Sequence, residues 1–350
     1  MPATRFTAKF SPIESTCLEV RHGIMTPFSG AFMGALISYG EGIYAIDSGY
    51  VRPGLAAIYV LVQQGRAALV ETGCNSAVSR VVMALNEIGI ARDAVDFVIP
   101  THVHLDHAGG AGAMMREFPN ACLVVHPRGA RHMADPSKLI AGTIGVYGAE
   151  ATQRLYGEIL PIDLGRIIEA NDGFVLSLAG RQLLCLDVPG HARHHIAIVD
   201  EKSGQIFTGD TFGVTYAELN GPQQQFVFPT TTPVQFEPEA LHASMDRLMS
   251  YRPAAVYPTH FGQLVDVERN GAALHRHLEA FVRIAREATM SGEVRHRQIH
   301  AALSRYALHE VRAVGCEVPE ARIVELLGND LELNAQGLGI WLDSQTVPAR

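Results

Sequence analysis

Residues 101–110, THVHLDHAGG, carry the strongest chemical signal in the chain. Within them His102, His104, Asp106 and His107 offer the imidazole and carboxylate groups that Zn²⁺ and similar metals favour. On an extended segment His102 and His104 point the same way, because side chains alternate with period two. Asp106 and His107 follow at a turn and can face a second centre. The segment therefore predicts a metal site.

Three later segments each place a metal-binding type of residue directly after a predicted strand. His191 ends PGH, Asp210 ends TGD and His260 ends PTH. Polar residues just beyond buried strands are typical of an active site at the edge of a sheet. Each segment alone has an ordinary explanation as a turn or a helix cap. Their joint occurrence with the first segment predicts that all of them serve one site.

Short strands mixed with helices must position these residues. Strands are predicted at 43–47, 57–63, 67–71, 96–100, 121–126, 174–177, 182–188, 195–199, 205–208 and 255–257. Helices are predicted at 78–88, 112–118, 145–158, 238–249, 275–288, 293–309 and 321–327. This order predicts an α/β (α+β) core with a C-terminal helical appendage. The predicted parts are an N-terminal extension at 1–40, a catalytic domain at 41–269 and a helical region at 270–350.

Composition narrows the class of protein. The 350 residues are 47% hydrophobic, which is ample for a core, and the net charge of −8 argues against a nucleic-acid partner. Five scattered cysteines indicate reduced thiols, and no membrane span or signal peptide is apparent. We expect a cytoplasmic protein with a small-molecule substrate and no membrane partner. Apolar residues at 323–327 and 338–341 cover a hydrophobic surface or form a homodimer contact.

The motif HxHxDH, followed by Gly-His, Gly-Asp and Thr-His, resembles the metallo-β-lactamase-fold superfamily, including its glyoxalase II and lactonase-like members. The resemblance covers about Gly42 to Phe261 and implies a four-layer αββα sandwich with two divalent metal ions at one edge. Zn²⁺ is expected, with iron and manganese as alternatives. By resemblance, metal one is bound by His102, His104 and His191. Metal two is bound by Asp106, His107 and His260, and Asp210 bridges the pair.

Such a pair of cations polarises the water between them and stabilises a developing oxyanion. The expected function is hydrolysis of an ester, thioester or lactone by a metal-bridging hydroxide. Asp106 is predicted to orient water or move a proton. Tyr216 is predicted to donate a hydrogen bond to a substrate carbonyl, as in similar lactonases, although a packed core tyrosine is an equal interpretation.

The alternative function is a non-hydrolytic diiron protein that binds, senses or reduces dioxygen. Members of that kind commonly have Glu where this chain has His104, because a carboxylate suits iron better. His104 therefore favours a zinc hydrolase. A β-lactamase is disfavoured by the lack of an export signal, and a nuclease by the negative charge.

Several neighbouring residues have predicted supporting roles. Glu71 stands where the family usually has Asp, so the hydrogen bonds around the metal ligands are expected to be rearranged. His195 is predicted to support the site without binding metal, and His126 and His132 to cap a helix or line the pocket. Aromatic residues form an apolar acyl-binding wall or pack into the core: Tyr216, Phe226, Phe228 and Phe236.

Overall fold

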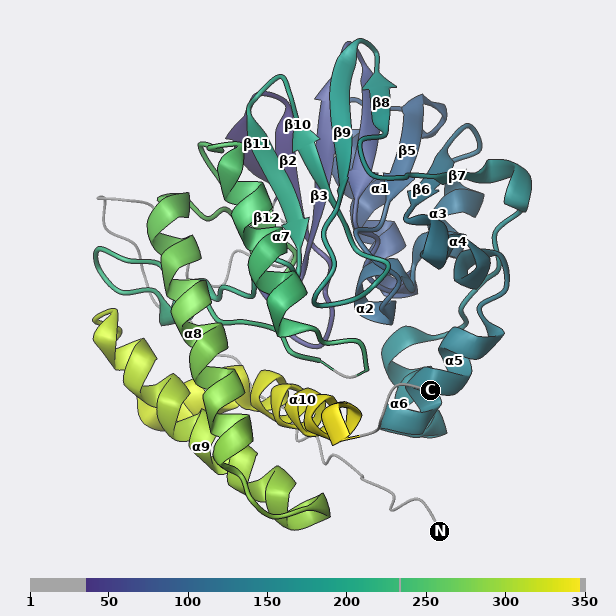
Figure 1. Ribbon diagram of the computed structural model, residues 1–350. Helices are drawn as coiled ribbons and strands as arrows, with labels where there is room; N and C mark the ends of the chain where they lie inside the picture. Colours follow the sequence, from purple (N-terminus) through teal and green to yellow (C-terminus); the bar gives the residue numbers. More distant parts are fainter. Residues whose placement is uncertain (1–35, 233, 347–350) are drawn as a thin grey trace. The chain divides into compact units, whose positions relative to one another are not determined.

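The computed structural model describes residues 36–346, except residue 233. The chain divides into two compact units, Met1–Cys185 and Leu186–Arg350. The described strands form a seven-stranded sheet, with order β1-β2-β3-β4-β5-β6-β7, and a five-stranded sheet, with order β12-β11-β10-β9-β8 (Figure 1).

The seven-stranded sheet begins with antiparallel pairing and continues with parallel pairing. Its strands are β1 (Ile37–Gly40), β2 (Ile43–Asp47), β3 (Ala57–Gln63), β4 (Arg66–Val70), β5 (Val95–Ile99), β6 (Cys122–Val125) and β7 (Ile167–Glu169). The turn between β3 and β4 holds Gln64 and Gly65 at positive φ, which suits a two-residue hairpin. From β4 to β7 the strands are parallel, and Val70 pairs with Ile99. Residues that follow β4 and β5 therefore lie at the same edge.

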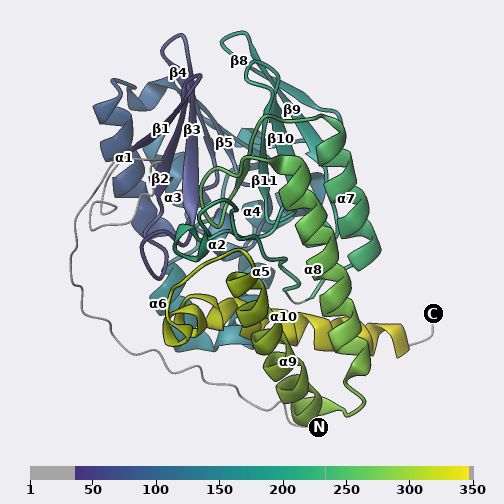
Figure 2. The same ribbon diagram turned by 90° about the vertical axis from the view of Figure 1, so that its left-hand side faces the viewer.

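Helices pack on this sheet through a shared apolar core. The helices of this unit are α1 (Val78–Glu87), α2 (Leu105–Ala108), α3 (Ala111–Glu117), α4 (Pro127–Ala134), α5 (Ser137–Tyr147) and α6 (Ala149–Tyr156), and α1, α3 and α4 contribute side chains to this core. Helices α1 and α3 contact the sheet (Figure 2). Their buried side chains include Val81, Leu85 and Met114. The apolar positions of α1 recur with helical spacing, so one face of the helix enters the core.

The remaining strands form the five-stranded sheet. They are β8 (Val175–Leu178), β9 (Arg181–Asp187), β10 (Ile196–Asp200), β11 (Gln205–Gly209) and β12 (Val256–Pro258). Strands β10 and β11 are antiparallel, whereas β11 and β12 are parallel, with Phe207 paired to Tyr257. Because β11 and β12 run the same way, Asp210 and His260 emerge at one edge.

Long helices make up most of the rest of the second unit. They are α7 (Pro238–Ser250), α8 (Val267–Glu287), α9 (Gly292–Ala313) and α10 (Glu320–Thr346). Helices α7 and α8 lie side by side (Figures 1 and 2), and α10 contacts both α8 and α9. The ring of Phe228 packs edge-to-face on Phe281 of α8, with centroids 4.8 Å apart. None of the described helices combines the length and apolar character that crossing a membrane requires.

Most predicted elements are found within one or two residues of their expected bounds, but some helices differ. The helix predicted at 145–158 is two helices, α5 and α6, because Gly148 has a φ of 81° and interrupts the helical path. The C-terminal helices are longer than predicted, and α10 continues to Thr346. Within the predicted N-terminal extension, residues 37–40 form β1, while residues 1–35 lie outside the described part of the chain.

Candidate metal centre

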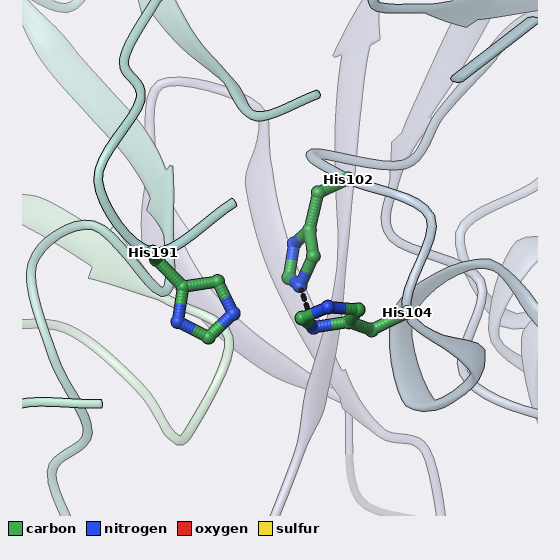
Figure 3. Close-up of side chains that lie close together, drawn as sticks. All are labelled: His102, His104 and His191. Atoms are coloured by element: carbon green, nitrogen blue, oxygen red, sulfur yellow. Dashed lines mark hydrogen bonds between the residues drawn. The ribbon is translucent and has the colours of Figure 1, made fainter. Parts of the chain in front are cut away.

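The first half-site consists of His102, His104, Asp106 and His107, which follow β5 in the first unit. His104 precedes α2, and Asp106 and His107 lie within that helix. Nε2 of His102 lies 2.8 Å from Nδ1 of His104 (Figure 3). The rings of His102 and His107 have centroids 4.0 Å apart, and Nε2 of His107 lies 3.6 Å from Oδ2 of Asp106. Four side chains of types that can bind metal therefore gather from one hexapeptide after the end of β5.

Burial keeps an imidazole of the first half-site uncharged. His102 and His107 are fully buried. Burial lowers the pKa of His104 to about 4, although the charge of Asp106 opposes this shift. A neutral imidazole is the form that binds a metal ion, so His104 is ready for ligation at pH 7.

Glu71, directly after β4, holds His107 in one orientation. Its Oε1 lies 3.0 Å from Nδ1 of His107. The same carboxylate accepts hydrogen bonds from the Thr101 hydroxyl at 2.6 Å and from the Thr101 backbone N–H at 3.1 Å. The backbone N–H and hydroxyl of Thr72 both donate to the carbonyl of His107. Because Nδ1 of His107 faces Glu71, its Nε2 is the nitrogen turned toward Asp106.

The second half-site consists of His191, Asp210 and His260 in the second unit. Each residue follows a strand, namely β9, β11 and β12. One carboxylate oxygen of Asp210, Oδ2, lies 3.5 Å from Nε2 of His191. The other, Oδ1, lies 3.7 Å from Nε2 of His260. The two oxygens of one buried carboxylate thus face two different imidazoles.

Two residues orient the second half-site. Nδ1 of His191 lies 2.8 Å from the Thr230 hydroxyl, which also donates to the carbonyl of Asp210 at 3.2 Å. Nε2 of His195 accepts a hydrogen bond from the backbone N–H of Asp210 at 3.1 Å. The ring of His195 therefore supports Asp210 by binding the Asp210 backbone, in agreement with the supporting role predicted for His195.

The chemistry of the donor atoms fits metal binding. His102 and His107 each have Nδ1 near an oxygen of a neighbouring side chain, at 3.2 and 3.0 Å, and His191 has the same arrangement. Such contacts select the tautomer and leave Nε2 for a metal. Imidazole nitrogens and carboxylate oxygens are ligands that Zn²⁺ accepts, and these residues could hold metal ions.

The structure places other predicted site residues away from ligand positions. Tyr216 is fully buried, and its hydroxyl donates to Oδ2 of Asp330 on α10 at 3.0 Å. His126 precedes α4 and accepts a hydrogen bond from the backbone N–H of Arg128, so its predicted capping role is confirmed. His132 lies on α4 beside Arg131. The predicted catalytic role of Tyr216 stays a prediction.

The proposed aromatic wall is part of the core. Phe226, Phe228 and Phe236 are at most 5% exposed, and Tyr216 is fully buried. Phe226 stacks on Phe228, and Phe236 contacts the ring of Trp341. The core interpretation of these residues is therefore correct, and an open acyl-binding wall formed by them is wrong.

Sequence reasoning missed Thr101 and Thr230. Thr101 directly precedes His102, so its proximity was visible, but its hydrogen bonds to Glu71 join two strands and depend on the sheet. Thr230 lies 39 residues after His191, in a segment with no recognisable motif. No local signal could have identified it.

Comparisons with known proteins agree with this geometry. Residues 51–260 match the pattern of the Metallo-beta-lactamase superfamily. A metallo-beta-lactamase fold-containing protein of Sulfurisphaera tokodaii, ST1585, is 25% identical over 232 residues, which cover 63% of this chain and 79% of that protein. A hydroxyacylglutathione hydrolase of a Synechococcus species is 32% identical over 114 residues. That match covers 33% of each chain, so this chain spans about a third of that relative.

Solved structures show the same fold. The crystal structure of ST1585 from Sulfolobus tokodaii aligns with a TM-score of 0.61 at 21% identity, covering 85% of this chain and 98% of that chain. The family protein TTHA1429 from Thermus thermophilus aligns with a TM-score of 0.61 at 20% identity, covering 87% of this chain and 94% of that chain. The predicted fold class, with two mixed sheets, flanking helices and C-terminal helices, is confirmed. Since the matched residues also include every member of both half-sites, the chain belongs to the metallo-β-lactamase superfamily.

Proposed function

We propose that this protein is a dinuclear metal-dependent hydrolase that cleaves an ester, a thioester or a lactone. The observation that carries the proposal is the carboxylate of Asp210, whose two oxygens each face a different histidine. A carboxylate with this arrangement is suited to being shared by two ions. Each imidazole that faces Asp210 would then serve a different ion.

In this proposal both half-sites contribute to each ion. His102, His104 and His191 would hold one ion together with Asp210. The second ion would be held by Asp106, His107 and His260. Zn²⁺ is the proposed metal because five of the seven ligands are imidazoles, and His104 stands where an iron-preferring site would favour a carboxylate.

Ions bound in this way would acidify a coordinated water and stabilise negative charge on a carbonyl oxygen. Other residues of the chain would orient the metal ligands, and Asp106 would transfer protons. Glu71 and Thr230 keep Nε2 of His107 and of His191 directed into the site. The side chain of Asp106 is 22% exposed, so its carboxylate can take a proton from water and return it to solvent.

Hydrolysis is supported by family membership, since members of this superfamily are mostly hydrolases. One relative that matches over part of its length is a hydroxyacylglutathione hydrolase. Both half-sites lack a serine or cysteine nucleophile, and a metal-dependent hydrolase does not need one. We therefore propose a small-molecule acyl compound as the substrate.

Elemental analysis combined with a substrate panel tests the proposal. Protein purified without added metal is expected to contain two zinc ions per chain and to hydrolyse aryl esters, thioesters or lactones. Asp210→Asn is expected to retain at most one ion and to lose at least about 100-fold in kcat. Asp200→Asn, which changes another buried aspartate, is the matched control and should keep both ions.

Two results would overturn this function. The first is two iron ions with a visible absorption band that depends on dioxygen, which would indicate the diiron alternative. The second is full zinc content in Asp210→Asn with unchanged turnover. Circular dichroism of each variant shows whether it has folded.

A further inference from the structure

A pair of histidines that belongs to neither half-site joins α7 to α8, which lie side by side in the second unit (Figures 1 and 2). Nδ1 of His242 on α7 lies 2.5 Å from Nδ1 of His275 on α8, and the two rings are parallel within 3°. Only one proton can lie between two facing nitrogens, so the other nitrogen turns a lone pair into the gap. In the candidate metal centre, His102 and His104 approach each other in a similar way, with two ring nitrogens 2.8 Å apart.

A carboxylate lies on the far side of one of these rings. Oδ1 of Asp246 on α7 is 3.1 Å from Nε2 of His275. A carboxylate beside one nitrogen of an imidazole favours a proton on that nitrogen and leaves the other nitrogen free to bind a metal ion. Nδ1 of His275, which faces His242, is therefore the nitrogen with the free lone pair.

Helical spacing adds two more carboxylates to the pair. On α8, Glu279 follows His275 by four residues, and on α7, Glu239 precedes His242 by three residues, so the members of each set share one helix face. A cavity of about 390 Å³ is lined by Glu239, His242 and Glu279. An imidazole and two acids therefore border the same open space.

The direction of the two helices brings the ends of these faces together. Gly271, near the start of α8, approaches Met249, near the end of α7. Glu279, farther along α8, lines the cavity with Glu239, near the start of α7. The two helices are therefore antiparallel, and the histidine pair lies between these two levels.

The charges around the pair favour a cation at its end of the cavity. Burial lowers the pKa of His242, and the neighbouring His275 lowers it further, so His242 is neutral at pH 7 and able to bind a metal. Arg283 and Arg286 line the cavity about one and two turns beyond Glu279. The guanidinium of Arg286 lies over the ring of Trp341, 5.5 Å from its centroid.

We propose that His242, His275 and Glu279 bind one Zn²⁺ ion that links α7 to α8. The ligands would be the two Nδ1 atoms and one carboxylate oxygen, with water at the fourth position of a tetrahedral ion. Asp246 would orient the ring of His275. This helical zinc site lies on other elements than the candidate metal centre and does not depend on the proposed function. Its role would be to hold the two helices together.

Calorimetric titration with ZnCl₂ tests the helical zinc site. Purified, dialysed protein should bind one zinc ion per chain in addition to those it already contains. His242→Gln, His275→Gln and Glu279→Gln should each weaken this binding at least about tenfold. Glu268→Gln, at an exposed acid of α8, is the matched control and should bind zinc as the wild type does. If the wild type takes up no additional ion, the site does not exist.

Another histidine pair offers a competing location for the added ion. His296 and His300 share one face of α9, with ring centroids 6.3 Å apart, and Nε2 of His296 lies 3.2 Å from Oε2 of Glu332 on α10. We expect His300→Gln to retain the additional zinc. Zinc binding that is lost in His300→Gln and kept in His242→Gln would place the ion on α9 and overturn the inference.

Hydrogen exchange and a centre variant separate this inference from the proposed function. Zinc should slow exchange of residues 238–250 and 267–287 in the wild type, because an ion bound by both helices restrains their opening. Asp210→Asn, which alters the candidate metal centre, should show the same protection. Zinc binding without protection of these helices would contradict a link between α7 and α8. Protection in Asp210→Asn would support the helical site even if the protein proves not to be a hydrolase.

Discussion

Nδ1 of His107 lies 3.0 Å from Oε1 of Glu71, and each of these side chains is 1% exposed. The family usually has aspartate at this position, and the longer side chain was expected to rearrange the contacts around the ligands. In the structure Glu71 has a φ of 71°, and Thr101 donates twice to its carboxylate. The positive φ of Glu71 and the two hydrogen bonds from Thr101 together place the longer glutamate side chain against His107.

Glu71→Gln should weaken metal binding. An amide has no negative charge to strengthen the basicity of His107, so we expect metal affinity to fall about 10- to 100-fold. Competition with a coloured chelator measures the affinity. Glu169→Gln, at an exposed position on β7, is the control and should bind metal as the wild type does. Equal affinity in both variants would show that Glu71 does not act on the ligand.

Tyr216→Phe and Asp330→Asn should destabilise the protein by similar amounts. Both changes weaken the hydrogen bond that the Tyr216 hydroxyl donates to Asp330. The side chain of Tyr216 is fully buried. We expect each to lower the free energy of unfolding by about 1–2 kcal/mol. Urea denaturation measures this loss.

Turnover of the same two variants tests the catalytic role predicted for Tyr216. A role at the substrate requires kcat to fall in Tyr216→Phe and to stay near the wild-type value in Asp330→Asn. Equal kcat values in the two variants would instead restrict Tyr216 to anchoring α10.

His277 should make stability depend on pH. Its ring is buried on α8, Nδ1 lies 2.8 Å from the Tyr306 hydroxyl, and burial lowers its pKa to about 4. In the unfolded chain the His277 imidazole takes up a proton near pH 6.5, whereas in the folded protein it stays neutral down to about pH 4. Protonation therefore favours the unfolded state, and the folded state loses stability as pH falls from 6.5 to 4. His277 should account for a loss of up to about 3 kcal/mol over this range.

Urea denaturation at pH 7, 5.5 and 4.5 checks the prediction for His277. His277→Leu should have a shallower dependence on pH than the wild type. His309→Leu, at an exposed position on α9, is the matched control and should retain the wild-type slope. A slope shared by all three proteins would contradict a contribution from His277.

Gly142→Ala and Gly145→Ala should each stabilise the protein. Alanine favours helix, and its Cβ would meet no atom at either position, so we expect a gain of about 0.5–1 kcal/mol per change. Gly112→Ala is the contrasting variant, because its Cβ would clash with the backbone of Leu160. Thermal denaturation should show a higher Tm for the first two variants and a lower Tm for the third. A lower Tm for Gly142→Ala would show that α5 needs glycine.

Local sequence was sufficient to predict the strands that precede the candidate metal ligands. Strand β3 has the predicted bounds, and the residues after β5, β11 and β12 are the predicted histidines and acid. Alternation and apolar runs are local properties, and the residue that follows a strand is visible in the sequence. The same signals could not show how far helices extend, so the break at Gly148 between α5 and α6 was missed.

Contacts between distant residues depended on the tertiary structure. The sequence of α8 does not show which of its histidines is buried, and His277 is buried against Tyr306, 29 residues later. The spacing of Phe226 and Phe228 in the sequence is equally compatible with a substrate-binding wall and with a packed core. Only the structure shows that both side chains are buried. Burial is set by the packing of several helices, and periodicity within one segment does not report it.

The sequence by itself determined the chemical groups of the candidate site, their order along the chain and their attachment to strand ends. Tertiary structure decided which nitrogen of His107 and His191 is available, because Glu71 and Thr230 reach them from other elements. It also decided that α5, rather than the phenylalanine-rich segment, presents an exposed apolar face. Ligand identity is a local property, whereas ligand orientation and surface exposure arise only when distant segments pack together.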